Sequence, residues 1–292
     1  MLPKTGIVAI VLAGFLYSVQ ASAFSLFWFG RSDNSVAEQT TTNKEQQDNY
    51  AIKVYPIDTQ DMPANMAEIS NQERKQLFVD ILLPLILLSN QAISEERSDL
   101  VVLFRGTTQQ SDLSGRQIRY LKVLAKKYKV KYDPQLGIPF RQEMLSRIDI
   151  IPVDLALAQA ANESAWGRSR FARDARNIFG IWTWNPKLGL APKRRDKGSR
   201  HYVRKFNSLG DSVAEYMRNL NTHRAYSDLR RLRASQRLHG QPLSGELLAS
   251  GLLSYSTRGK DYVSSLRIII SSNQFDRYNN ATLVSSLTLA SL

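Results

Sequence analysis

The sequence predicts a mainly α-helical protein (α+β) that carries one small β-hairpin. Apolar residues recur at the three- and four-residue spacing of helices in most segments between residues 71 and 278. The region 182–206 differs, because Trp182 and Trp184 alternate as in a strand and a cation-rich stretch with Pro and Gly follows. Polar residues dominate the region 31–66. We therefore expect one helical domain behind a linker.

Composition limits the classes of function. The chain has 292 residues, enough for one globular domain with extensions, and its formal charge of +13 favours an anionic partner. The cell envelope, acidic lipid headgroups and nucleic acid all fit that charge. The absence of cysteine excludes disulfides, a thiolate nucleophile and a lipoprotein anchor. The three histidines are His201, His223 and His239, and they lack metal-ligand spacing, so we expect no metal site.

The N-terminus predicts export. Lys4 precedes an apolar run from Ile7 to Tyr17, and Ala21-Ser22-Ala23 forms a small-x-small cleavage site, so residues 1–23 are predicted to be a signal peptide. The alternative is an uncleaved membrane anchor, because the apolar character continues through residue 29. Residues 24–66 are predicted to be a flexible linker.

Residues 67–135 predict an N-terminal helical region packed on the core. A helix begins at Asn71, Pro84 is expected to kink or end it, and the acidic stretch from Ser94 is expected to start another. Residues 114–131 predict a basic amphipathic helix. Its basic face is interpreted either as a solvated surface or as a surface that adsorbs to an anionic envelope polymer. Nucleic acid is not an expected partner, because an exported protein would rarely meet it.

Residues 136–278 form the predicted main domain. Helices are expected over 141–147, 152–167, 208–222, the basic stretch after residue 223, 244–253 and 263–270. Residues 279–292 are expected to be a loose tail.

The helix that follows Pro152 carries one carboxylate near its end, Glu163. Gly167 is a natural stop, and so many alanines let neighbouring backbones approach closely. The negative end of the helix dipole and the apolar neighbours both raise a carboxyl pKa, as general acid catalysis requires. A lone Glu near a helix end is more often a solvated surface residue, so this pattern alone leaves both interpretations open.

An aromatic segment follows. Trp182 and Trp184 are interpreted either as a stacking surface for sugar rings or as core tryptophans. Gly180 predicts a turn or a close backbone approach. Asn177 can serve the site or pin the turn by bonding backbone groups.

Several spaced motifs resemble a known family. The stretches A-Q-A-A-N-E-S-A-W-G-R-S-R-F-A at 158–172, N-I-F-G-I at 177–181 and Y-S-T-R-G-K-D-Y at 255–262 resemble the glucosaminidase domain of bacterial cell-wall hydrolases, glycoside hydrolase family 73. The stretches K-Y-K-V-K at 127–131, R-I-D-I-I-P at 147–152 and N-L-N-T-H-R-A-Y-S at 219–227 resemble its Bax-type members.

The resemblance implies a lysozyme-like helical domain with a β-hairpin beside the active-site cleft. It implies hydrolysis of the β-1,4 bond after N-acetylglucosamine in peptidoglycan, without a cofactor, in the periplasm or from an inner-membrane anchor that faces it. Glu163 would be the catalytic acid and Tyr255 a second catalytic residue. Expected substrate-binding residues are Trp166, Asn177, Phe179, Trp182, Trp184 and Tyr262.

Two departures from the family pattern keep alternatives open. Many members place a second Glu in the hairpin, whereas Asp196 is the one carboxylate of this segment, and Arg258 replaces the usual Asp of the downstream motif. Either the substrate's 2-acetamido oxygen or a directed water would then complete the reaction. A muramidase or lytic transglycosylase on the same glycan, and a non-catalytic envelope-binding protein, are the competing functions.

Overall fold

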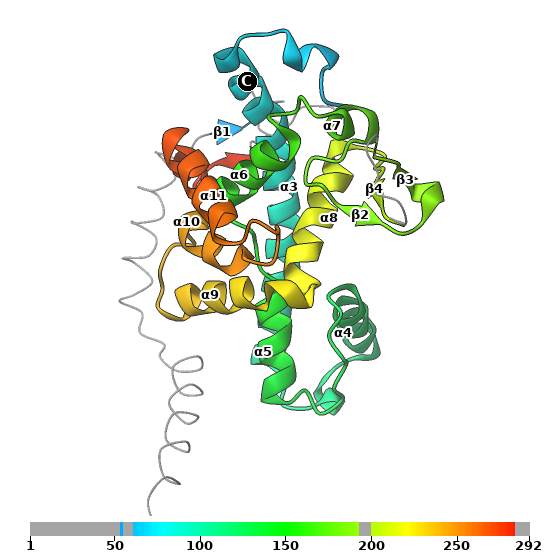
Figure 1. The fold of residues 1–292 in the computed structure, drawn as a ribbon. Helices are drawn as coiled ribbons and strands as arrows, with labels where there is room; N and C mark the ends of the chain where they lie inside the picture. Colours follow the sequence, from blue (N-terminus) through cyan, green and yellow to red (C-terminus); the bar gives the residue numbers. More distant parts are fainter. Residues whose placement is uncertain (1–52, 55–60, 193–199, 284–292) are drawn as a thin grey trace, which may run out of the picture. The chain divides into compact units, whose positions relative to one another are not determined.

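The chain folds as a set of helices with two small sheets (Figure 1). The structure is a computed structural model that describes residues 53–54, 61–192 and 200–283. The helices are α3 (Asn71–Arg105), α4 (Gly115–Lys127), α5 (Ile138–Arg147), α6 (Val153–Ser164), α7 (Arg170–Ala175), α8 (Leu209–Thr222), α9 (Ser227–Leu238), α10 (Gly245–Leu248) and α11 (Lys260–Ser272). The strands are β1 (Lys53–Val54), β2 (Trp182–Thr183), β3 (Gly189–Leu190), β4 (Tyr202–Arg204) and β5 (Thr282–Leu283). The predicted mainly α-helical fold with a small hairpin is confirmed.

The longest described helix is α3. Ser70 caps it in a capping box with Glu73. We predicted a kink or a stop at Pro84 and a new helix at Ser94, but one helix of 35 residues runs through both positions. Pro84 is buried among apolar neighbours of the same helix, and this packing offsets the hydrogen bond that proline removes.

By length and composition, α3 is the one described helix that would suit a bilayer, with a mean hydropathy of 1.7 over its most apolar window. However, 56% of that window is buried inside the domain. The apolar surface of α3 is therefore used as core. The predicted signal peptide lies outside the described residues.

Helix α6 lies in the middle of the domain, between α11 and α3 (Figure 1). Every residue from Val153 to Ala161 is buried. Small side chains permit this central position, and α10 approaches most closely at Gly245, where a Cβ atom would collide with Asp154. The Gly245 amide donates to the Asp154 carboxyl at 3.1 Å. The sequence predicted this helix. Pro152 is its N-cap residue, and Val153 occupies the first helical position.

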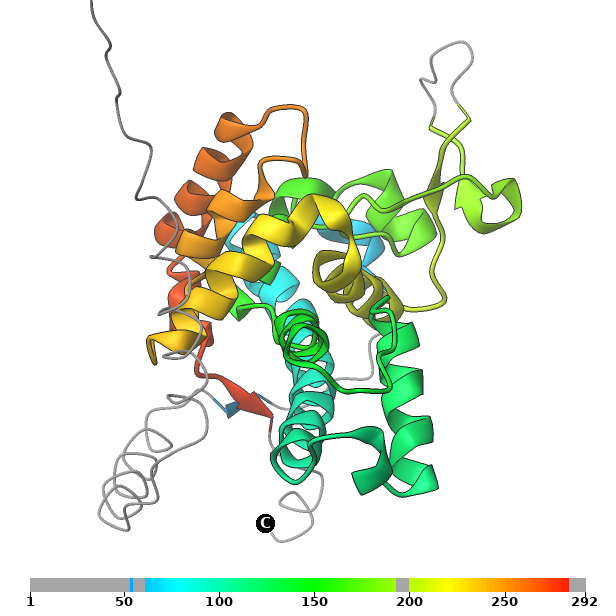
Figure 2. The same cartoon turned by 90° about the horizontal axis from the view of Figure 1, so that it is seen from below.

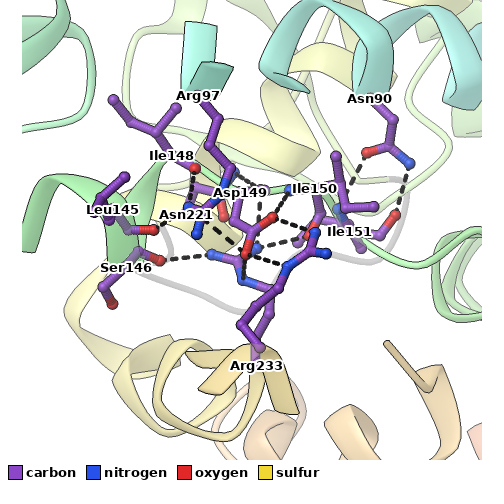
Figure 3. A network of polar contacts seen from close by, with 11 residues as sticks. Asn90, Arg97, Leu145, Ser146, Ile148, Asp149, Ile150, Ile151, Asn221 and Arg233 are labelled. Carbon is purple, nitrogen blue, oxygen red and sulfur yellow. Dashed lines mark hydrogen bonds and ion pairs between the residues drawn. The ribbon is translucent and has the colours of Figure 1, made fainter. Parts of the chain in front are cut away.

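A buried ionic network holds the segment that leads into α6 (Figure 3). Arg233 of α9 is fully buried and donates to the carbonyl oxygens of Ser146, Asp149 and Ile150 at 2.8, 3.0 and 2.9 Å. Burial raises the pKa of Asp149, but the charges of Arg233, Arg237 and Arg97 outweigh it and hold the pKa below its ordinary value. The sequence indicated a strongly basic helix here, and the fold turns two of its arginines, Arg230 and Arg233, inward.

The predicted hairpin is a three-stranded antiparallel sheet in the order β2-β4-β3. Trp182 pairs with Val203 and Gly189 pairs with Arg204. Both views show this sheet projecting to one side of the helices (Figures 1 and 2). Asp196 falls within residues 193–199, outside the described residues.

Parts of the predicted linker and tail pack on the domain. Met62 and Met66 are buried in the core, although both lie within the expected linker. Strands β1 and β5 pair in parallel, Lys53 opposite Thr282, so residues from the expected linker and tail lie side by side. Isolated apolar residues in a polar stretch produce no periodic signal, which is why the pattern did not predict these contacts.

Candidate active site

Glu163 is the next-to-last residue of α6, and an unusual turn follows it. Ala165, Trp166 and Gly167 have φ of 50°, 59° and 78°, three left-handed residues in succession. The helix therefore ends at Ser164, three residues before the glycine that we expected to stop it. A Cβ atom at Gly167 would collide with Met62, so only glycine fits where this turn packs on the core.

Ser164 fixes this turn from within. Its hydroxyl donates to the Ala160 carbonyl at 2.7 Å and accepts from the Gly167 amide at 2.9 Å. The side chain of Ser164 is fully buried. Ser164 directly follows Glu163 in the chain. Because these two hydrogen bonds fix Ser164, the backbone from which the Glu163 side chain extends has a defined position.

The Glu163 carboxyl lies in a half-buried environment with polar contacts on several sides. Asn162 donates its amide to Oε1 at 3.0 Å, and a Cβ atom built on Gly180 would lie 3.6 Å from Oε2. Burial raises the pKa of the Glu163 carboxyl above its ordinary value. Hydrogen bonds from Asn162 and Tyr262 and the positive charge of Arg258 act in the opposite direction without cancelling the effect. A carboxyl whose pKa is raised in this way keeps its proton to a higher pH than an exposed one, which favours its use as a proton donor.

Tyrosines surround this carboxyl. The Tyr255 hydroxyl donates to the Phe179 carbonyl at 2.9 Å, which fixes the backbone next to Gly180. The rings of Tyr255 and Tyr262 stack with centroids 5.5 Å apart. Burial raises the pKa of both hydroxyls, so both stay protonated at any pH where the protein works. The structure therefore brings Glu163, Tyr255 and Tyr262 together, as expected.

Two residues that the sequence analysis missed connect to Tyr262. The Tyr216 hydroxyl donates to the Gln159 side-chain oxygen at 2.7 Å, and the Gln159 amide donates to the Tyr262 hydroxyl at 2.9 Å. With its oxygen accepting from Gln159, Tyr262 has its own proton free to donate toward Glu163. The signal was present, because Gln159 is a polar residue in an apolar helix, four positions before Glu163 and on the same face.

The other expected substrate-binding residues divide into packed and exposed sets. Asn177 is buried and pins its turn, accepting from the Ile181 amide at 2.9 Å and donating to the Ile181 and Arg204 carbonyls at 2.8 Å each. Phe179 is buried, and its ring stacks on that of Tyr216 with the two centroids 3.8 Å apart. These contacts favour the structural role that we had left open for Asn177.

Trp166 is partly buried and packs against the core. Its ring contacts Phe78 and Phe275, with centroids 5.5 and 6.0 Å apart, and Lys75 Nζ lies 4.8 Å from the ring centroid. In this structure Trp166 anchors the end of α6 to α3.

Trp182 and Trp184 remain open, with exposed fractions of 55% and 73%. Trp182 follows Gly180 by two residues and stacks on His201 with ring centroids 4.0 Å apart. Trp182 begins β2, and Trp184 directly follows that strand. Such exposed aromatic surfaces suit the apolar faces of sugar rings.

Within the described chain, the groups that shift the pKa of Glu163 include no second carboxylate. In the same part of the chain, no group of three His, Asp or Glu residues has the arrangement of a metal site. The chemistry that the described residues offer is proton donation by one carboxyl next to hydroxyl and aromatic groups.

Comparison with known proteins agrees with this geometry. Residues 138–275 match the family model described as mannosyl-glycoprotein endo-beta-N-acetylglucosaminidase, a glucosaminidase domain. The fold and the site thus define a glycan-hydrolysing domain of this class. The chain is also 35% identical to Protein bax of Escherichia coli (strain K12) over 206 residues, which cover 70% of this chain and 72% of the relative. The chain belongs to the Bax-type family of glucosaminidase-domain proteins. No solved structure matches it significantly.

Proposed function

We propose that this protein cleaves the β-1,4 glycosidic bond that follows N-acetylglucosamine in peptidoglycan, with Glu163 as the general acid. The observation that carries the proposal is the half-buried Glu163 carboxyl, whose pKa is raised, at the end of the central helix of a glucosaminidase domain. Glycosidases need such a protonated carboxylic acid beside the scissile bond.

In the proposed reaction the Glu163 proton moves to the glycosidic oxygen as the bond to the sugar breaks. The sugar develops oxocarbenium character, and Glu163 becomes a carboxylate. Donation from Asn162 and Tyr262 stabilises that carboxylate, because both interactions favour its charged form. The leaving sugar thus departs as an alcohol.

The other face of the sugar needs a nucleophile. Because no second carboxylate acts on Glu163 within the described residues, we propose that the substrate's own 2-acetamido oxygen attacks the anomeric carbon and that water then opens the resulting ring. The Tyr255 hydroxyl donates its hydrogen bond to the Phe179 carbonyl. Its oxygen can therefore accept a hydrogen bond from the acetamido N–H and orient that group. A water directed by another group is the competing route.

Substrate binding is assigned to the exposed indoles. We propose that Trp182 and Trp184 stack on successive sugars of the glycan strand, as their exposure permits. The buried Asn177 and Phe179 are assigned to shaping the turn that carries Gly180.

The proposed setting is the periplasm, because the predicted export signal and the wall substrate both require it. Helix α4 supports attraction to an anionic envelope surface. Arg116, Arg119, Val123 and Lys126 share its exposed face, and the one ion pair that α4 forms within the described residues joins Lys127 to Glu96.

Mass spectrometry of fragments released from purified peptidoglycan by residues 31–292 tests the proposal. We expect fragments with N-acetylglucosamine at the reducing end, and a rate that falls about 10²–10⁴-fold in Glu163→Gln with unchanged thermal unfolding. Reducing or anhydro muramic ends would assign the protein to the muramidases or lytic transglycosylases. Wall binding without fragments from either protein would identify a binding module.

A further inference from the structure

The loop Ser256–Gly259 lies at the margin of the candidate site. Tyr255, directly before it, is held by its hydrogen bond to the Phe179 carbonyl, and Tyr262, three residues after its end in α11, stacks on Tyr255. Both tyrosines lie close enough to Glu163 for their hydroxyls to interact with its charge. The chain between them therefore passes beside the Glu163 carboxyl.

Arg258 is the exposed cation of this loop. Its Nη2 donates to the Ser265 hydroxyl at 2.7 Å and to the Asp261 carbonyl at 3.5 Å. Ser265 donates its own proton to the Asp261 carbonyl at 2.7 Å, so its oxygen is committed to accepting from Arg258. One edge of the guanidinium is thus fixed on α11.

The remaining edge of this guanidinium has no protein partner in the described chain. Arg258 forms no ion pair there, whereas Arg204 of β4 pairs with Glu215 at 3.0 Å. A held guanidinium with free N–H groups matches a carboxylate in geometry as well as in charge.

We propose that Arg258 forms a subsite that binds a carboxylate on the substituents of the glycan next to the scissile bond. The inference rests on the proposed function, because it places the carboxylate on a glycan held at Glu163. The carboxylate has two sources, the acidic groups of peptide stems and the lactyl group of an unsubstituted muramic acid. The chemistry is the same for both, a charge-assisted hydrogen bond to an exposed and pre-positioned arginine.

Binding of a carboxylate at Arg258 also changes the pKa of Glu163. The positive charge of Arg258 lowers the pKa of Glu163 in the free protein. A bound carboxylate neutralises that charge, so substrate binding raises the pKa of Glu163 and favours the protonated acid. The upper pH limb of kcat on acidic glycan is therefore expected at higher pH than the upper limb of kcat/KM.

The test compares one glycan in two charge states. Three substrates are used: purified peptidoglycan, the same material with its carboxyls converted to neutral amides, and stem-free glycan that retains the lactyl carboxylate. The activity on each substrate is measured for the wild type, for Arg258→Gln and for the control Arg231→Gln. Arg231 is an exposed arginine of α9 whose loss removes the same charge elsewhere. We expect Arg258→Gln to lower kcat/KM about tenfold on acidic glycan and less than twofold on amidated glycan. Loss on the stem-free glycan would assign the lactyl carboxylate, and loss on intact material alone would assign the stems.

Cosedimentation of the same variants in a Glu163→Gln background with both forms of sacculi gives a second readout that needs no cleavage. We expect Arg258→Gln to remove the preference for the acidic form. Equal effects of Arg258→Gln on acidic and amidated glycan, or no effect on binding to either, would overturn the subsite. If the wild type releases no fragments, the proposed function fails, and the binding preference still decides the subsite.

Discussion

Replacing Asp149 with Asn would leave Arg233 charged and buried without its principal counter-ion. Both side chains are almost completely buried, with exposed fractions of 3% for Asp149 and 1% for Arg233. Removing one partner of a buried ion pair costs about 3–5 kcal/mol, because the remaining charge is uncompensated. We expect Asp149→Asn to lower the free energy of unfolding by this amount, and Tm by roughly 6–20 °C for a domain of this size.

Urea unfolding at pH 7 measures the effect, with Asp228→Asn as the control. Asp228 pairs with Arg231 on the surface, with exposed fractions of 60% and 77%, so its loss should cost less than about 1 kcal/mol. A second variant, Asp149→Asn combined with Arg233→Met, removes both charges and should recover part of the loss.

The effect of pH on Asp149→Asn has a defined sign. The folded-state pKa of Asp149 is lowered, so its contribution is present above the ordinary carboxyl pKa of about 4 and is lost as the pH falls through the folded value. The difference between wild type and variant should therefore shrink in acid. A difference below about 1 kcal/mol at pH 7, or one that grows in acid, would refute this account of the network.

Three further variants probe the site and the surface. Tyr262→Phe removes an interaction that lowers the pKa of Glu163, so the pH at which activity falls on the alkaline side should rise; an unmoved limb in the pH profile of kcat/KM would contradict this role. Trp184→Ala should raise KM for long glycan about five- to tenfold with thermal unfolding unchanged, and an unaltered KM would remove this indole from the binding surface. Arg119→Gln with Lys126→Gln should weaken binding to anionic sacculi at low salt and flatten its salt dependence, and a salt response equal to that of the wild type would show that α4 takes no part.

The sequence predicted those parts of the fold in which local and long-range preferences agree. Helices α6 and α8 were expected, and Ser208 caps α8 by accepting from the Asp211 amide. Glu163 was singled out by its place at a helix end, and burial, which corresponds to one of the two predicted causes, raises its pKa. These features depend on a few consecutive residues, so a pattern can indicate them.

Other features depend on contacts that no local pattern encodes. A basic stretch in a helix usually indicates a solvated face, yet Arg233 is fully buried because its partners are backbone carbonyls and Asp149, 84 residues earlier in the chain. Likewise, Pro84 signals a break, but it is buried in the core and α3 continues through it. Gln159 was missed because its role becomes visible only when Tyr216 and Tyr262 are placed beside it.

The parallel pairing of β1 with β5 brings the first and the last described strands of the chain together. Lys53 and Thr282 are directly opposite, so the chain enters and leaves the described domain at a single place. A segment joined to either end of this domain therefore starts from the same place on the fold.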